Sequence, residues 1–205
     1  MGVRGFARAA LIGTAALALG AIPAAAQTVT FSTTGAFSGG GCTTTSCTFG
    51  DFTLSFTPVG SNAFFSGSLV DLGSFTAGCS VASCAETNFP SGVTFTLTIN
   101  QTNPSSGSGA FVGSIAGTLA FDPSFSSLVW TPTPSSLTLG TVGLTGTYNI
   151  VVDNTGNFNI AAPGDQNPNP TVVKAFVTTT PEPATVALMA TGMFGLIPVI
   201  RRRRK

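Results

Sequence analysis

The segment Val93-Thr94-Phe95-Thr96-Leu97-Thr98-Ile99 alternates an apolar residue with a threonine at every step. Successive side chains of a β-strand point to opposite faces, so this pattern predicts a strand with one buried face and one wet, hydroxyl-bearing face. Similar alternation recurs at residues 52–57, 111–121 and 142–152, with turn-forming Gly, Pro, Asn and Asp in between. One-sided strands of this kind are typical of antiparallel sheets.

These strands define one predicted domain, residues 27–180, which is long enough to enclose a core. Further strands are expected at residues 126–130 and 171–177. Eight to eleven short strands separated by turns predict an all-β fold, an antiparallel β-sandwich, with a β-barrel or a β-solenoid as alternatives. Helices are expected only outside this domain, as an N-terminal signal-peptide helix and a C-terminal hydrophobic helix.

The predicted domain is poor in charge and has no histidine. The whole chain has 7% charged residues and a net charge of +1, against about 25% charged residues in an ordinary soluble domain. Residues 27–180 contain one basic residue, Lys174, and six acidic residues, so their formal net charge is −5. An acidic surface excludes nucleic acid as a partner. The missing imidazole excludes Ser-His-Asp and Cys-His catalysis, so we predict no enzyme and no cofactor, with a carboxylate pair that hydrolyses glycosides as the catalytic alternative.

The four cysteines lie in an internal repeat. Residues 35–47 align with residues 73–84 after one deletion, and each copy ends in a C-x4-C pair, Cys42 with Cys47 and Cys79 with Cys84. A strand follows each copy, so two related hairpins on neighbouring edges of one sheet are expected. A disulfide within each pair is the preferred interpretation. Crossed pairing between the repeats and a four-cysteine zinc site are the alternatives.

Residues 1–26 have the three parts of a secretory signal peptide. Arg4 and Arg8 supply a positive start, residues 9–21 form an apolar run, and an A-x-A cleavage signature ends at Ala26. As a helix, the apolar run spans about 20 Å, which is too short for a bilayer core of about 30 Å. We predict export by the Sec machinery and cleavage by signal peptidase between Ala26 and Gln27.

Residues 181–205 also have three ordered parts. Pro181-Glu182-Pro183 comes first, residues 184–200 are uncharged and largely apolar, and Arg201-Arg202-Arg203-Arg204-Lys205 ends the chain. The apolar part lies at the lower length limit for a transmembrane helix. By the positive-inside rule, the basic end places the tail in the cytoplasm and the domain outside.

This arrangement closely resembles the PEP-CTERM sorting signal of exported Gram-negative bacterial proteins. The resemblance implies that an exosortase, an integral-membrane cysteine protease, recognises the Pro-Glu-Pro end and removes the tail. The protein would then pass from an inner-membrane-anchored precursor to the cell surface or to an exopolysaccharide matrix. A tail-anchored surface protein that is never cleaved is the alternative.

The domain itself offers few candidate ligand sites. Trp130 is the only tryptophan and a possible sugar contact, because sugars stack on such rings. The preferred interpretation places it instead in the core, at the end of the strand at residues 126–130. Calcium loops are conceivable at residues 153–157 (Asp153, Asn154, Asn157) and 165–169 (Asp165, Asn167, Asn169), but ordinary turns are the preferred interpretation, so no metal is predicted. We therefore expect a non-catalytic structural or interaction protein of the surface or matrix. A carbohydrate-binding module for the co-exported polysaccharide is the alternative.

Overall fold

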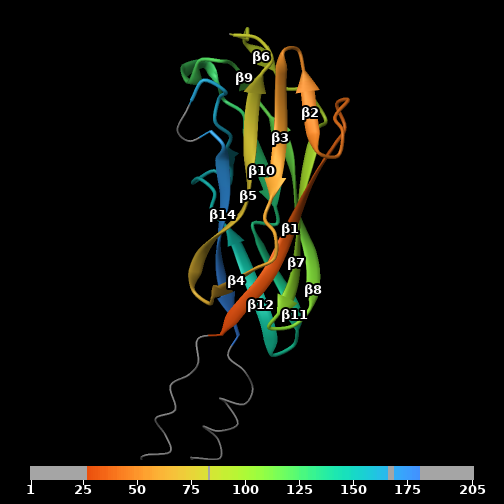
Figure 1. The fold of residues 1–205 in the computed structure, drawn as a ribbon, viewed down its shortest axis with the longest axis vertical. Coiled ribbons are helices and arrows are strands. Elements are labelled where there is room, and N and C mark those ends of the chain that lie inside the picture. The colour runs from red at the N-terminus through yellow and green to blue at the C-terminus, as the bar shows by residue number, and fades with distance from the viewer. Residues whose placement is uncertain (1–26, 83, 166–168, 181–205) are drawn as a thin grey trace, which may run out of the picture. The chain divides into compact units, whose positions relative to one another are not determined.

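The structure is a computed structural model that describes residues 27–82, 84–165 and 169–180. These residues form one compact unit built from two curled antiparallel sheets of six strands each (Figure 1). The predicted all-β class is therefore confirmed. Within the described ranges, no helix is long and apolar enough to cross a membrane. The predicted signal-peptide helix and the C-terminal helix at about residues 184–200 lie outside the described residues.

Sheet A is centred on the alternating segment, which forms β7 (Thr94–Asn103). Its strand order is β13-β10-β8-β7-β1-β4, and all neighbouring strands are antiparallel. The other five strands are β1 (Thr28–Ser38), β4 (Asn62–Phe65), β8 (Gly107–Ala116), β10 (Val129–Thr133) and β13 (Phe158–Asn159).

Sheet B has the strand order β11-β12-β14-β5-β3-β2 and is also antiparallel throughout. Its strands are β2 (Ser46–Phe49), β3 (Phe52–Pro58), β5 (Ser68–Cys79), β11 (Ser136–Thr141), β12 (Leu144–Ile150) and β14 (Thr171–Thr179). A separate two-stranded sheet pairs β6 (Thr87–Asn88) with β9 (Thr118–Leu119). Its strands lie near one end of the molecule (Figure 1).

The inner faces of the two sheets share one apolar core. The alternation of β7 decides which of its residues enter that core, because Phe95, Leu97 and Ile99 are fully buried while the threonines between them are not. The Phe95 ring lies 4.7 Å from the Phe75 ring of sheet B and 5.3 Å from the Trp130 ring. Aromatic side chains from both sheets therefore hold the layers together.

Several details of the predicted strands are wrong. Val142, which shares the buried parity of residues 142–152, is fully exposed in the turn before β12. Gly143 beside it has a φ of 87°, which begins the turn rather than the strand. Trp130 does not end a strand at residues 126–130 but lies near the start of β10. Phe121, also expected in the core, is 38% exposed beyond β9.

The two repeat units do not form hairpins on one sheet, contrary to the expectation. The first unit leads from β1 in sheet A to β2 and β3 in sheet B, and the second leads from β5 in sheet B to β7 in sheet A. As a result β1 pairs with β7, and β3 pairs with β5. Alternation determines which face of a strand is buried but not which sheet the strand joins, which explains the error.

Equivalent glycines of the two repeats make room for one phenylalanine ring. A Cβ atom at Gly35 in sheet A would lie 2.3 Å from the Phe56 ring, and one at Gly73 in sheet B would lie 2.2 Å from it. Gly73 also has a φ of +134° and follows Leu72, which is left without a partner where the β5–β14 register shifts. The repeated glycine therefore lets both sheets close around Phe56.

The unit begins and ends at one pole, which we call the exit end. The N–H of Ser66, in the turn between β4 and β5, donates to the Gln27 carbonyl at 2.9 Å. The Ser66 hydroxyl accepts from the N–H of Thr179 at 3.0 Å. Strands β1 and β5 both run away from this pole, so both cysteine loops lie at the opposite pole, the cystine end (Figure 1).

Candidate functional site

The cystine end holds two disulfides, Cys42–Cys47 and Cys79–Cys84. The predicted pairing within each repeat is therefore confirmed, and crossed pairing is wrong. A four-cysteine zinc site is also wrong, because all four sulfur atoms are consumed in disulfides. In the part of the chain that the structure describes, no three His, Cys, Asp or Glu side chains gather as a metal site.

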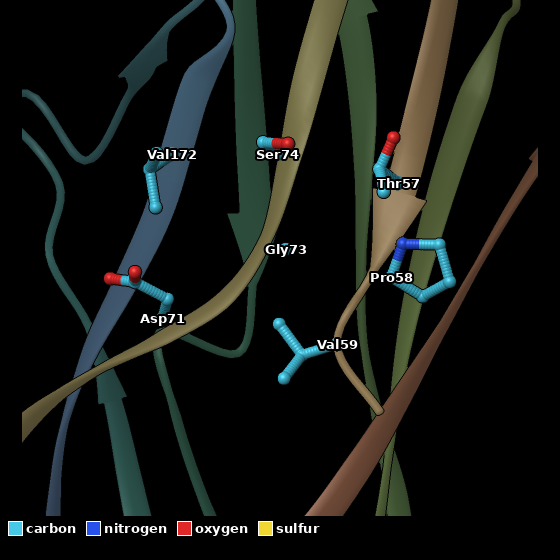
Figure 2. Close-up of a pocket in the computed structure, with 7 residues that line it drawn as sticks. All are labelled: Thr57, Pro58, Val59, Asp71, Gly73, Ser74 and Val172. Atoms are coloured by element: carbon cyan, nitrogen blue, oxygen red, sulfur yellow. The ribbon is translucent and has the colours of Figure 1, made fainter. Parts of the chain in front are cut away.

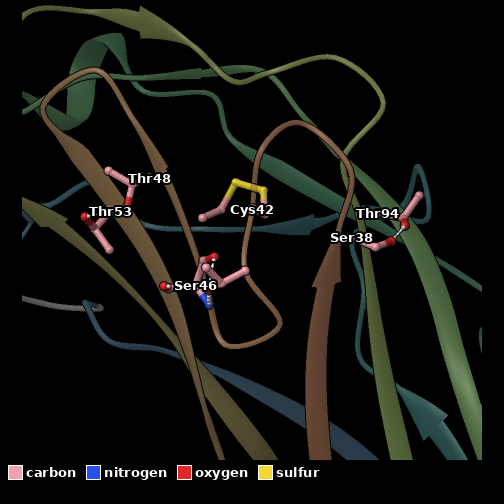
Figure 3. The surroundings of a disulfide bond; sticks show 8 residues. Ser38, Cys42, Ser46, Thr48, Thr53 and Thr94 are labelled. Carbon is pink, nitrogen blue, oxygen red and sulfur yellow. Dashed lines mark hydrogen bonds between the residues drawn. A yellow bond between two sulfur atoms is a disulfide. The ribbon is translucent and has the colours of Figure 1, made fainter.

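Each disulfide closes a loop at which the chain crosses from one sheet to the other. Cys47 lies on β2, the edge strand of sheet B, and the loop before it turns back through Thr43 and Ser46 (Figure 3). The carbonyl of Thr44 accepts from the N–H of Phe37 in sheet A at 3.0 Å. In the chain-entropy model, closing so short a loop stabilises the fold by about 2 kcal/mol. The loops therefore fasten the crossovers.

The structure places Trp130 in the core, as the preferred interpretation had it, and not at the surface, where a possible sugar contact would need it. The side chain is fully buried, and its ring packs against Phe75, Phe95 and Phe158 with centroid distances of 5.9, 5.3 and 6.3 Å. Trp130 follows the inward parity of β10, whereas Thr131 points outward. The neighbouring prolines in the sequence indicated an exposed segment, but the ring fills the core and offers no face to a ligand.

The first calcium loop is an ordinary turn. One carboxylate oxygen of Asp153 accepts from the N–H of Thr155 at 2.8 Å, from the Thr155 hydroxyl at 2.6 Å and from the N–H of Asn157 at 2.9 Å. These hydrogen bonds, that of the Thr155 hydroxyl first, hold the pKa of Asp153 below its usual value. The carboxylate thus stabilises its own loop, as aspartate commonly does in turns.

The second candidate loop serves to join elements. The side-chain amide of Asn169 donates to the Ala77 carbonyl at 3.0 Å, and its oxygen accepts from the Ala77 N–H at 3.4 Å. Asn167 lies outside the described residues. The amide that was a candidate calcium ligand therefore ties the loop before β14 to β5.

A shallow hollow of about 210 Å³ lies where β3 and β5 separate at the Gly73 bulge (Figure 2). Asp71, Ser74 and Thr57 bring polar groups to it, and Pro58, Val59 and Val172 form its apolar part. Pockets that enclose a drug-sized ligand run from about 300 to 1,000 Å³. The Asp71 carboxylate already lies 3.7 Å from the Lys174 ammonium. The hollow is therefore smaller than this range, and its one acidic side chain already has a basic neighbour.

A buried hydrogen-bond network near the exit end was missed by the sequence analysis. Gln101 is 2% exposed, and its side-chain oxygen accepts from the Tyr148 hydroxyl of sheet B at 2.9 Å. Its amide nitrogen donates to the carbonyls of Ser105 at 2.9 Å and Leu139 at 3.3 Å. Burial raises the pKa of Tyr148 well above its usual value. Gln101 continues the buried parity of Phe95, Leu97 and Ile99, and that parity is the signal that could have placed it inside.

A second polar bridge joins the sheets at the bulge. The Thr33 hydroxyl, buried in sheet A, donates to the Leu72 carbonyl at 2.8 Å and accepts from the Val59 N–H at 2.8 Å. A buried carbonyl at an irregular point of a sheet needs such a partner. Thr33 therefore satisfies the bulge that Gly73 makes possible.

The outward residues of sheet A form an uncharged surface, which we call the hydroxyl face. Side chains on neighbouring strands pair across it, as in the 2.7 Å hydrogen bond between Ser38 and Thr94 (Figure 3). Ser108 likewise donates to Asn100 at 2.9 Å. The face comprises Thr28, Thr30, Ser32, Thr34, Ala36 and Ser38 of β1, Thr94, Thr96, Thr98 and Asn100 of β7, Ser108, Ala110, Val112, Ser114 and Ala116 of β8, and Val129, Thr131 and Thr133 of β10.

Comparison with known proteins decides what the C-terminal residues are. Residues 179–205 match the family model of the PEP-CTERM protein-sorting motif. The chain carries a PEP-CTERM sorting signal. This confirms the resemblance seen in Pro181-Glu182-Pro183, the apolar span and the terminal arginines. A PEP-CTERM signal implies an exported, membrane-anchored precursor that an exosortase processes toward the cell surface. No curated protein and no solved structure matches the chain.

Proposed function

We propose that this PEP-CTERM protein is a non-catalytic structural or interaction protein of the cell surface or exopolysaccharide matrix. The observation that carries the proposal is the sorting motif at residues 179–205, joined to a β unit whose surface is dominated by threonine and serine. Exosortase is its processing partner, and the exopolysaccharide is the matrix in which it resides.

The absence of catalysis is supported by how the charged groups of the unit are used. The sequence has no histidine, and the Lys174 ammonium is paired with Asp71. Asp153 and Asp122 accept hydrogen bonds within their own turns, Asp122 from the N–H of Ser124 at 2.9 Å. These three carboxylates are engaged in local contacts, which favours a structural role for them over that of the acid and base of glycoside hydrolysis.

Processing at both chain ends is compatible with the hydrogen bonds of the unit. Gln27 is the first residue tied to the turn at Ser66, and Thr180 donates its N–H to the Thr145 carbonyl at 3.2 Å. Cleavage before Gln27 and after Thr180 would therefore leave every described strand paired. We propose that signal peptidase cuts between Ala26 and Gln27, and that exosortase removes the tail beginning near Pro181.

The test is the intact mass of protein recovered from outside the cell. We expect a chain that starts at Gln27, ends near Pro181 and has lost four hydrogens to two disulfides. The control is a variant with Pro181→Ala, Glu182→Ala and Pro183→Ala, which should stay with the membrane fraction at its full C-terminal length. Recovery of wild-type protein that still carries Arg201 to Lys205 would contradict processing, and recovery only from the cytoplasm would contradict the surface role itself.

A further inference from the structure

The lack of charge on the hydroxyl face is its most informative property. A soluble surface ordinarily has about 25–35% Lys, Arg, Glu and Asp, yet none of the outward residues of β1, β7, β8 and β10 is charged. Asp71 and Lys174 lie on the outside of sheet B. Asp51, Glu86, Asp122, Asp153 and Asp165 lie in loops. The charged side chains therefore lie outside these four strands. Asp153 comes nearest at the margin of the face, where its carboxylate accepts from Asn159 of β13 and Asn157 of its loop accepts from Thr131.

The side chains of the face are also short. Apart from Asn100, every outward residue of these four strands is Thr, Ser, Ala or Val, and the register places them in rows across the strands. Ala36, Thr96 and Val112 form one such row at the centre. Sheets with small side chains can approach to about 10 Å and interdigitate, as stacked sheets do. The short side chains of the surface thus allow another backbone to approach it closely.

Exposed apolar groups lie on the same side. Phe65 on β4 is opposite Thr28, next to the inward-pointing Phe64, and is 63% exposed. Val112 on β8 is 44% exposed. Protein interfaces combine apolar anchors with a polar, uncharged surround, and aromatic residues are enriched in them. Phe65 and Val112 therefore supply anchors at the edge and centre of the hydroxyl face.

We propose that the hydroxyl face of sheet A is a self-association surface, and that its occupant is the same face of a second copy. Each copy has a formal net charge of −5 over residues 27–180, so two copies repel one another in most orientations. Face-to-face contact through this surface places no charged side chain of β1, β7, β8 or β10 against the partner copy. The contact is isologous, so a two-fold axis passes through the face. The inference rests on the proposed structural role, because such a protein contributes to a matrix by joining copies.

The area is sufficient for a weak, specific contact. Four strands at about 4.8 Å spacing and about ten residues at about 3.3 Å rise give a surface of about 600 Å². A standard interface buries about 800 Å² per partner, and weak specific contacts lie below that. We therefore expect reversible association at micromolar concentrations. Higher salt should strengthen it, because salt screens the repulsion between acidic bodies.

The experiment is sedimentation of the oxidised protein as recovered from cells, for wild type and two matched variants. Thr96→Glu places a charge at the centre of the hydroxyl face, and Thr76→Glu places one on the outside of sheet B. Both threonines are half-buried, outward residues of interior strands, so their effects on folding should be alike. We expect a concentration-dependent dimer that Thr96→Glu weakens at least tenfold and Thr76→Glu leaves unchanged.

Several results would overturn the inference: a wild-type monomer at every concentration, equal weakening by both variants, or a dimer that high salt dissociates. Retention of a monomer on neutral polysaccharide, lost in Thr96→Glu, would assign the face to the polymer instead. Val112→Glu repeats the test at a more exposed position, should Thr96→Glu fail to fold. Localisation and intact mass test the surface role separately, so a monomer that still reaches the matrix would refute only the self-association.

Discussion

Different interactions join the two sheets at the two ends of the β unit. At the cystine end, two disulfides close the crossover loops, and phenylalanine rings such as Phe49 and Phe89, 4.6 Å apart, fill the space between the sheets. Toward the exit end, Gln101 and Tyr148 join the sheets by hydrogen bonds, and Ser66 ties the first and last strands. Apolar contact is common to both ends, so the difference is that the cystine end depends on redox state and the region near the exit end on a buried hydrogen bond.

The largest expected effect is on the aromatic core that both ends share. Phe95→Ala removes a fully buried ring that contacts Phe37, Phe56, Phe75 and Trp130, and should lower the free energy of unfolding by about 3–5 kcal/mol. Denaturant unfolding followed by Trp130 fluorescence measures it. The matched control is Phe65→Ala, whose ring is 63% exposed and whose effect should stay within about 0.5 kcal/mol.

The hydrogen-bonded region is tested by a double-mutant cycle. Tyr148→Phe leaves the Gln101 side-chain oxygen unpartnered, and Gln101→Leu leaves the Tyr148 hydroxyl unpartnered, so each should cost about 1–3 kcal/mol. The double variant should cost less than the sum of the two, by about 0.5–3 kcal/mol of coupling. Strictly additive losses would show that the hydrogen bond contributes nothing to joining the sheets.

The disulfides should contribute a comparable amount. Replacing Cys42 and Cys47 together by serine should lower the free energy of unfolding by about 2 kcal/mol. Urea unfolding with and without dithiothreitol measures the combined contribution of both disulfides in the unmutated protein. If the reductant left the urea midpoint of the wild-type protein unchanged, the disulfides would not stabilise the cystine end, and the proposed difference between the two ends would be wrong.

Alkaline pH should act on the exit end through the single tyrosine of the chain. Because the folded-state pKa of Tyr148 is raised, its contribution to stability is complete below the unfolded value of about 10 and is lost as pH rises through the folded value. Unfolding midpoints above pH 10 should fall in wild type more than in Tyr148→Phe. The phenolate absorbance, which only this residue can give, should appear together with unfolding and not before it.

The smallest effect is expected at acid pH from Asp153, whose carboxylate is exposed and whose pKa is lowered by its turn. Its contribution is present above the ordinary aspartate pKa of about 4 and is lost as pH falls through the lowered folded value. Asp153→Asn should therefore cost a little at neutral pH and nothing at the acid limit. If Asp153→Asn lowered the free energy of unfolding at neutral pH as much as Phe95→Ala does, the loop would stabilise the fold far more than its exposure indicates.

The sequence predicted those features that depend on neighbours along the chain. Alternation placed Phe95, Leu97 and Ile99 inside because a strand turns every second side chain the same way. The C-x4-C pairs closed locally, and the sorting signal is read from consecutive residues. The hydroxyl face also follows from alternation, as the other parity of the same strands.

What the sequence could not predict depends on partners far along the chain. The Gln101–Tyr148 hydrogen bond joins residues 47 positions apart, and no local pattern announces it. The crossing of each repeat unit from one sheet to the other follows from competition among many possible strand pairings. A core position was the preferred interpretation of Trp130, but the prolines beside it left a sugar contact as an alternative, which the buried ring excludes.

The position of β14 has a consequence for the order of folding. This last strand pairs with β12 on one side and β5 on the other, in the middle of sheet B. A chain that crosses a membrane N-terminus first delivers β14 last, when β12 and β5 are still two separated edges. Sheet B therefore closes only when the residues immediately before the sorting signal have emerged, and arrival of the signal at the membrane coincides with completion of the fold.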